Sequence, residues 1–500
     1  MLRVCAVALA GVLALAGPGS AASLRIGLQS DPDLLDPARG GSFVGRVVFA
    51  ALCDKLVDVS DDLKFVPQLA TDWTWSPDGK ALTMRLRSGV TFHDGEPFDA
   101  EAVRFNIKRY KDASYSVRKG ELKPVTDVEV VDPLTVRFIL SAPYAPLLSV
   151  LADRAGMMMA PKATEKAGEA ASSNPSCSGP FRFKQRVAQD KIVFERFPDY
   201  WDAKSILVDE VTYLPIPDPT VNLMNLRAGQ LDIIERIAAT DMEAAKTDAR
   251  IRVSSAPSLA YYTLSINLAD KSPNASPMSK DARVREAFEL SFDRRVVNEV
   301  VFGGAFVPSN QTEPPGSRYF NPDVPLPQRD VEKAKKLLKE AGYDRVPFTI
   351  TVANNPTDQQ VAQVIQSMSA EAGFDVKIDA MEATSMVDRT NRGDYQSAVV
   401  IWSGRTDPDG NLTHWAACDG YLNWGKYCDP EVDKLLNQAR TVTDEAQRVA
   451  LYRQATSRWL AARAHLVLYH LNWLRAYSVR VQGFHNSPDG IIRLQGVSLR

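Results

Sequence analysis

The sequence predicts an α/β protein with at least two lobes, and three observations lead to that prediction. The chain has 500 residues, too many for a single hydrophobic core. Its first half shows strand patterns joined by hairpin turns, whereas residues 330–402 alternate between strand and helix. Hydrophobic residues make up 45% of the chain and charged residues 24%, which are the values of an ordinary globular protein.

Residues 1–22 are expected to be a signal peptide. A basic start is followed by a short apolar run, and Ser20 and Ala22 fit the small-x-small rule for cleavage. The run is too short for an ordinary membrane span, and Cys5 precedes it, which argues against a lipoprotein. We expect a mature chain that starts at Ser23 and is exported to the periplasm; the alternative is an uncleaved anchor.

Strands and helices are mixed from residue 23 to residue 301. Strand patterns are found at residues 23–29, 82–86, 134–140, 177–183, 191–196, 208–216 and 261–268. Helical spacing is found over residues 44–57, 99–110, 219–228 and 281–301, the last as one long helix. Asp99 is a preferred N-cap residue. This part of the chain therefore combines antiparallel hairpins with helices.

The order strand–helix–strand is clearest after residue 330. Helices are predicted for residues 330–342, 358–372, 430–440 and 444–463, and strands for residues 347–353, 374–378, 396–402 and 465–471. Strands separated by a helix at this spacing pair in parallel. The second half therefore predicts a parallel sheet.

The strand that ends at Trp402 leads into an unusual segment. Residues 403–428 are expected to be irregular and contain Arg405, Asp407 and Asp409 together with several aromatic side chains. A strand that ends in a charged loop is where an α/β domain usually holds its ligand. We therefore expect this loop to lie over a cleft.

Four cysteines remain after residue 22, and an exported protein with an even number favours disulfides over metal ligation. Three pairings are possible, of which we favour Cys418–Cys428, which closes a short loop, with Cys53–Cys177 as the second bond. Four buried free thiols are the alternative.

The sequence does not predict an enzyme, because it has no nucleophile, zinc-protease, phosphate-loop or dinucleotide motif and no pattern selects an acid/base pair among its many carboxylates. His465 and His470 lie in an apolar strand, where packing is the expected role. No metal and no cofactor are expected, since an EF-hand register from Asp407 would place a cysteine at its twelfth position. The net charge of −2 argues against nucleic acid as a partner.

Several motifs resemble a known family over essentially the whole mature chain. They are VPQLATDWTWSPDGKALTMRLRSGVTFHDGEPFDAEAVRFNIKRY (66–110), SGPFRF (178–183), FPDYWD (197–202), DARVREAFELSFDR (281–294), DVEKAKKLLKEAG (330–342) and WSGRTDPDGN (402–411). This set resembles the peptide/nickel-type (cluster C, family 5) extracytoplasmic solute-binding proteins of ABC importers, and among them the dipeptide- and oligopeptide-binding members. CSGPF departs from the G-T-G-P-type run that is usual in the family.

The resemblance implies a two-lobe periplasmic-binding-protein fold (type II, Venus-flytrap) that closes around its ligand. Lobe I would consist of residues 23–264 and 478–500, with an inserted subdomain at about 61–185, and lobe II of residues 265–477. The protein would be a monomer that delivers its ligand to permease subunits with their ATPases.

The resemblance also implies where the ligand lies. In the peptide-binding members an aspartate of this loop pairs with the ligand's α-ammonium group, and Asp407 matches that position best, followed by Asp409. A buried ammonium group needs a carboxylate partner. Arg405 could clamp a carboxylate. The further expected contacts are Trp402, Tyr421, Trp424, Tyr262 and Asn267.

The expected ligand is a small peptide or a peptide-like zwitterion. Within the same fold, a nickel chelate, glutathione, an opine or a sugar are the alternatives. A periplasmic hydrolase and a chaperone or signalling receptor are the alternatives from other classes.

Overall fold

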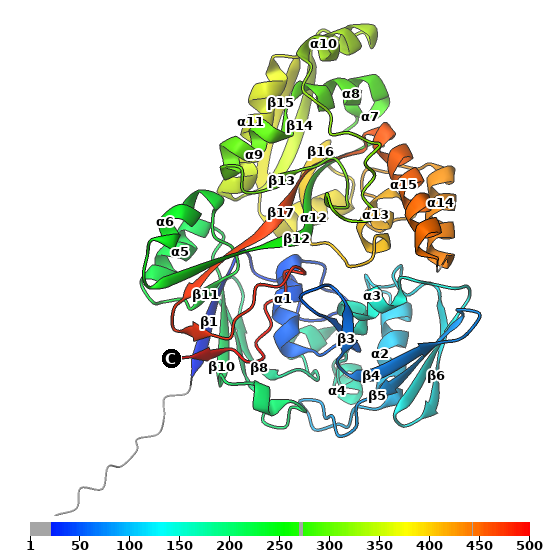
Figure 1. Ribbon diagram of the computed structural model, residues 1–500, viewed down its shortest axis with the longest axis vertical. Coiled ribbons are helices and arrows are strands. Elements are labelled where there is room, and N and C mark those ends of the chain that lie inside the picture. Colours follow the sequence, from blue (N-terminus) through cyan, green and yellow to red (C-terminus); the bar gives the residue numbers. More distant parts are fainter. Residues whose placement is uncertain (1–21, 270–273, 443) are drawn as a thin grey trace, which may run out of the picture.

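Two bodies joined by two long strands make up the protein (Figure 1). The structure is a computed structural model that describes residues 22–269, 274–442 and 444–500. Of the expected signal peptide, residues 1–21 lie outside the described residues. In the described part of the chain, no helix combines the length and the apolar character needed to cross a bilayer.

One sheet runs through both bodies in the order β15-β14-β16-β12-β17-β11-β1-β10-β9-β8, and β13 pairs with β17. Its strands are β1 (Ser23–Leu28), β8 (Phe181–Val187), β9 (Lys191–Arg196), β10 (Glu210–Pro215), β11 (Ile233–Ile234), β12 (Ile251–Ile266), β13 (Val307–Pro308), β14 (Val346–Ala353), β15 (Phe374–Met381), β16 (Ser397–Trp402) and β17 (His465–Ser478). The lower body in Figure 1 contains β1, β8 and β10, and the upper body contains β14–β16.

β12 and β17 pair antiparallel over almost their whole length and connect the two bodies. Both strands are longer than the predicted 261–268 and 465–471. The first half of β12 was not predicted because its apolar and polar residues do not alternate regularly. It has few buried side chains and contains Pro257. Tertiary pairing with β17 holds that half in strand conformation.

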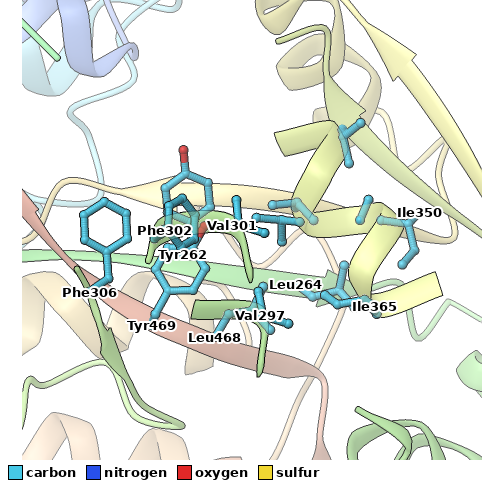
Figure 2. Packing of buried hydrophobic residues seen from close by; sticks show 14 of the residues in the cluster. Tyr262, Leu264, Val297, Val301, Phe302, Phe306, Ile350, Ile365, Leu468 and Tyr469 are labelled. Atoms are coloured by element: carbon cyan, nitrogen blue, oxygen red, sulfur yellow. The ribbon is translucent and has the colours of Figure 1, made fainter. Parts of the chain in front are cut away.

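Hydrophobic side chains of β12 and β17 pack in one continuous core, part of which Figure 2 shows. The rings of Tyr262 on β12 and Tyr469 on β17 stack with centroids 5.0 Å apart. Phe306 stacks on the same Tyr469 ring at 5.6 Å. The part of β12 and β17 around Tyr262 and Tyr469 is therefore tightly packed.

The parallel pairing predicted for the second half is confirmed. β14 pairs in parallel with β15 and with β16, and α11 (Pro356–Ala370) connects β14 to β15. α11 begins before the predicted residue 358, because the side chain of Asn355 caps it by accepting from the Asp358 amide. α10 (Val331–Glu340) starts after its expected cap, Asp330.

The prediction of one long helix over residues 281–301 is wrong. The structure has two helices, α8 (Ala282–Ser291) and α9 (Arg294–Phe302). Asp293 lies between them in extended conformation and accepts a hydrogen bond from the Arg295 amide, which caps α9. An aspartate within a helical pattern can start a second helix because its carboxylate satisfies a free backbone N–H group.

The lower body contains a second sheet of four strands in the order β4-β5-β7-β6. Its strands are β4 (Ala70–Trp75), β5 (Ala81–Leu86), β6 (Val125–Asp132) and β7 (Thr135–Leu140). α2 (Ala100–Asp112) packs on it and is capped by Asp99, as predicted. The four strands lie within the predicted inserted subdomain, but their core cluster extends beyond it to Ala38, Leu56, Val57 and Val59. The bounds of the subdomain and of the lobes stay predictions.

The other elements are short connections and peripheral helices. They are α1 (Phe43–Leu52), α3 (Leu147–Leu151), α4 (Pro161–Ala167), α5 (Pro219–Arg227), α6 (Met242–Lys246), α7 (Pro277–Lys280), α12 (Ala383–Asn391), α13 (Asp409–Ala416), α14 (Pro430–Thr441), α15 (Glu445–Ala462), β2 (Val57–Val59), β3 (Phe65–Pro67), β18 (Val481–Gln482) and β19 (Ser498–Leu499).

The last residues of the chain return to the lower body, beside β1 (Figure 1). Val481, Ile492 and Val497 belong to the same core cluster as Leu24 and Ile26 of β1. The first and last segments of the described chain therefore share one core.

Both favoured disulfides are present in the structure. Cys418 and Cys428 are bonded across a separation of 10 residues, and Cys53 and Cys177 across 124. The long bond connects α1 to the segment just before β8.

Candidate functional site

The segment after β16 turns sharply at Gly404. This glycine has φ +76°, and a Cβ there would lie 2.3 Å from Cβ of Leu259. Only glycine fits such a left-handed position beside another backbone. Residues 403–428 were expected to be irregular, which is wrong in part, since Asp409–Ala416 form α13. Asp-Pro-Asp-Gly is good turn chemistry and conceals the start of this helix.

Asn411 on α13 holds the loop together from inside. Its Oδ1 accepts hydrogen bonds from the Arg405 amide (2.7 Å) and from Nε1 of Trp402 (3.3 Å). Its Nδ2 donates to Oε1 of Glu313 (2.7 Å) and to the Arg405 carbonyl (3.0 Å). The hydroxyl of Tyr261 donates to its carbonyl oxygen at 2.7 Å. The loop is therefore tied to β12 and to the residue-313 segment.

Arg405 joins the two bodies. Its Nε lies 2.6 Å from Oδ2 of Asp153, and the side chains of both residues are 8% exposed. Nε of Arg46, on α1, donates to the other oxygen of Asp153 at 3.0 Å, and its Nη1 donates to Oγ of Ser403 at 3.1 Å. α1 and Asp153 belong to the lower body, whereas the loop after β16 belongs to the upper one. A buried ion pair thus connects the two bodies.

Other contacts also connect the lower body to the upper one. The hydroxyls of Ser149 and Thr406 are 3.1 Å apart, and the Ala145 amide donates to the Arg440 carbonyl at 3.0 Å. Burial by itself would raise the pKa of Asp153, but Arg405 and Arg46 hold that pKa well below its ordinary value. Asp153 is therefore an ionised carboxylate between cations of both bodies.

The carboxylates of Asp407 and Asp409 are bound by arginines of the upper body. Asp407 accepts two hydrogen bonds of 2.8 Å from the guanidinium of Arg448 on α15. Oδ1 of Asp409 accepts from Nε of Arg440 at 2.7 Å and from the hydroxyl of Thr413 at 2.7 Å. The contact of either aspartate with a ligand ammonium group stays a prediction.

Aromatic side chains surround Arg405. Its guanidinium carbon lies 4.5 Å from the ring centroid of Trp402, and the ring of His414 is 5.8 Å from Trp402. The ring of Tyr421 packs on that of His414 with centroids 4.5 Å apart, so both rings belong to this group of aromatic side chains. Trp424 packs against Trp415 at 5.6 Å. Burial lowers the pKa of His414 to about 3, so its ring is neutral at neutral pH.

Tyr262 and Asn267, the two remaining expected ligand contacts, have hydrogen-bond partners within the protein. The hydroxyl of Tyr262 accepts from Nη1 of Arg236 at 3.3 Å. Nδ2 of Asn267 donates to the carbonyl oxygens of Gly393 (3.0 Å) and Tyr395 (2.9 Å). Their contact with a ligand also stays a prediction.

Three arginines and an aspartate at this place, Arg46, Arg118, Arg154 and Asp153, were not among the predicted site residues. We call Arg46, Arg118, Arg154 and Arg405 the arginine cluster; all four are buried. Nη2 of Arg118 and Nη1 of Arg154 donate to the same oxygen, that of Gly40, at 3.2 and 3.0 Å. In the sequence, Asp153 and Arg154 are two adjacent charged residues within a strongly apolar run. This pattern could have indicated that they are buried and functional.

Other candidate sites fit less well. His465 and His470 are buried on β17, as expected for packing residues. The described residues contain no group of three His, Cys, Asp or Glu side chains that could hold a metal ion. Two open surface hollows, of about 430 Å³ beside Arg87 and about 660 Å³ beside His93, lie in the lower body and not at the gap.

The chain matches the family model of the bacterial extracellular solute-binding proteins, family 5 (middle), over residues 64–423. The glutathione-binding protein GsiB of Pectobacterium atrosepticum is 28% identical over 479 residues, which cover 93% of this chain and 92% of that protein. GsiB of Escherichia coli K12 is 28% identical over 484 residues, covering 94% and 93%.

Solved structures are similar over nearly the full length. The periplasmic binding protein DppA of Helicobacter pylori, in complex with the peptide STSA, is 25% identical with a TM-score of 0.88, covering 95% of this chain and 98% of that one. AgaA of A. tumefaciens R10, in complex with agropinic acid, is 26% identical with a TM-score of 0.88, covering 96% and 99%.

Proposed function

Because the chain belongs to the bacterial extracellular solute-binding proteins of family 5, the ligand-binding receptors of ABC importers, we propose that it captures a small peptide or a peptide-like zwitterion. The solute would lie in the gap between the two bodies, next to the loop after β16. Permease subunits with their ATPases would receive it, and the receptor would work as a monomer in the periplasm after its signal peptide has been removed.

The observation that carries this proposal is the buried ion pair between Asp153 and Arg405, with Arg46 on the same carboxylate. A buried charge is stable only when it is paired, so the pair favours the arrangement in which the bodies are close together. β12 and β17 are the connections about which the bodies would rotate. A solute that binds the closed arrangement better than the open one would shift the population toward it.

We propose Trp402, Arg405 and Tyr421 as the ligand contacts of the upper body. Trp402 and Tyr421 provide apolar walls, and Arg405 provides a cation with donors in a fixed geometry. The role is binding without turnover. Glutathione is a second candidate solute, since GsiB proteins are relatives over nearly the full length.

Native mass spectrometry of protein purified without added ligand tests the function. We expect a bound species whose released mass is that of a small peptide or an amino-acid derivative. Cleavage of such a compound by the protein would contradict a receptor role, and protein that stays ligand-free with every peptide and amino-acid derivative offered would overturn the proposal.

A further inference from the structure

The strongest unexplained feature of the molecule is the positive charge buried in the arginine cluster. Four guanidinium groups meet there, and Asp153 and Glu121 are the carboxylates buried among them. Asp33 is only half-buried, and it accepts hydrogen bonds from the backbone of Gly41 and the hydroxyl of Ser42. The cluster therefore holds more cations than buried anions.

The contacts show that these charges form one network. Arg46 and Arg405 share Asp153, and both also donate to Oγ of Ser403. Arg118 and Arg154 share the Gly40 carbonyl. Nε of Arg154 is 3.9 Å from Asp153, beyond hydrogen-bond distance. Two pairs of like charges are therefore held close together with little space for water.

The cluster also contains donors without acceptors. Nε of Arg118, Nε of Arg154 and Nη2 of Arg405 are buried and have no hydrogen-bond partner among the described residues. The three side chains are 1%, 2% and 8% exposed. A buried charged donor without an acceptor costs free energy that a bound anion would recover.

Burial, together with the neighbouring charge of Arg118, lowers the pKa of Arg154 to about 9. Burial and the neighbouring charge of Arg46 also lower the pKa of Arg405. Asp153 opposes this effect without cancelling it. The pKa of Arg118 is raised instead, because its burial is outweighed by neighbouring acidic groups, of which Glu121 contributes most. Repulsion therefore acts on Arg154 and Arg405, and a negative group beside them would relieve it.

We infer that the solute of this protein is an organic anion whose carboxylates outnumber its ammonium groups, held by Arg118, Arg154 and Arg405. The inference rests on the proposed receptor function and narrows its solute class from zwitterions in general to anionic peptides and amino-acid derivatives. Guanidinium groups suit carboxylates because their parallel N–H groups match the two oxygens. Arg405, the one member from the upper body, would couple anion binding to closure.

The test uses peptides that differ in charge, of which Ala-Glu and Ala-Gln are isosteric. Binding of Ala-Glu, Ala-Gln, Ala-Lys and glutathione to the full mature chain is measured by calorimetry, together with any solute found bound after purification. We expect the anionic members, Ala-Glu and glutathione, to bind at least tenfold more tightly than Ala-Gln, and Ala-Lys to bind most weakly. Comparable affinities for Ala-Glu and Ala-Gln would overturn the inference and leave the receptor function standing, whereas no binding of any solute would count against both.

Variants separate a ligand role from a structural one. Arg154→Gln should lower the affinity for the anionic solute at least tenfold and, because it relieves repulsion, should leave the melting temperature of the empty protein unchanged or higher. Arg154→Lys keeps the charge and should retain most of the affinity. Arg345→Gln, an exposed arginine paired with Asp375, is the matched control and should change neither quantity. A lower melting temperature for Arg154→Gln with unchanged affinity would show a purely structural arginine and overturn the inference.

Discussion

Oδ2 of Asp153 lies 2.6 Å from Nε of Arg405, and this buried contact joins the lower body to the loop after β16. A second ion pair, Lys123–Asp419, connects the lower body to the same segment of the upper one at 3.2 Å, but both of its side chains are 76% exposed. The two ion pairs therefore differ mainly in burial. The exposed pair can serve as the control when the buried pair is removed.

We expect Asp153→Asn to open the empty protein. Removing one partner of a buried ion pair costs about 3 kcal/mol, so the ratio of closed to open molecules should fall roughly a hundredfold. Small-angle scattering without solute measures this as a larger radius of gyration. Asp419→Asn should leave the scattering unchanged, because exposed pairs contribute only about 0–1 kcal/mol. Equal curves for Asp153→Asn and the unmutated protein would show that the pair does not hold the bodies together.

Asp407 and Arg448 should behave as one unit. Their two hydrogen bonds of 2.8 Å predict that Asp407→Asn or Arg448→Gln alone lowers the free energy of unfolding by about 3 kcal/mol. The double variant should lose little more than either single variant, which corresponds to a coupling of about 2–3 kcal/mol in chemical denaturation. Calorimetry with an amino-terminated ligand decides the second role, since affinity unaffected by Asp407→Asn would remove the predicted ammonium contact.

Asn411→Ala should destabilise the loop around Arg405. The change leaves buried partners on Trp402, Arg405 and Glu313 unsatisfied, at a cost of about 3 kcal/mol. Thermal unfolding measures this loss, and ligand affinity should fall with it. Asn437→Ala on the exposed face of α14 is the control and should change the melting temperature very little. Equal melting temperatures for both variants would be inconsistent with the proposed role of Asn411.

Glu313 should make the stability of the protein depend on pH. Burial raises the pKa of Glu313 from 4.5 to about 7, so between these values the folded state binds a proton that the unfolded state does not. The contribution of Glu313 to the free energy of unfolding therefore decreases as the pH rises from 4.5 to 7. Glu313→Gln lacks this proton and should be more stable than the unmutated protein by about 3 kcal/mol above pH 7, but not below pH 4.5. Denaturation at pH 4, 6 and 8 checks this, and a difference that does not vary with pH would refute it.

The two disulfides should contribute unequally. The chain-entropy model gives a cost of about 3 kcal/mol for losing the bond across 10 residues and about 5 kcal/mol for the bond across 124. Paired serine variants of Cys418/Cys428 and of Cys53/Cys177, compared by chemical denaturation, measure the two values. A larger loss for the short loop would mean that local packing, and not loop closure, dominates.

The elements with a regular local pattern could be predicted from the sequence. The strand–helix–strand order after residue 330, the Asp99 and Asp330 caps and both disulfides agree with the structure. The predictions failed where tertiary contacts decide. Asp293 divides a helical pattern with a single side-chain hydrogen bond, and the first half of β12 depends on pairing with β17.

The sequence singles out the loop after β16 because a strand ends there, and in the structure this loop contacts the lower body through Arg405. Its role as the ligand site stays a prediction. Asp153, Arg118 and Arg154 come from far earlier in the chain, and no local periodicity relates them to Arg405. The tertiary structure determines which carboxylate pairs with an arginine, and the sequence does not reveal it. Asp407 and Arg448 are an example.

The shared core of β1 and the C-terminal segment has a consequence for the order of folding. Leu24 and Ile26 need Val481, Ile492 and Val497 to complete their cluster, so the lower body cannot finish folding before the last residues have been synthesised. The same holds for β12, whose partner β17 follows much later in the chain. Contacts between residues so distant in sequence make folding slow, since loop closure must precede them.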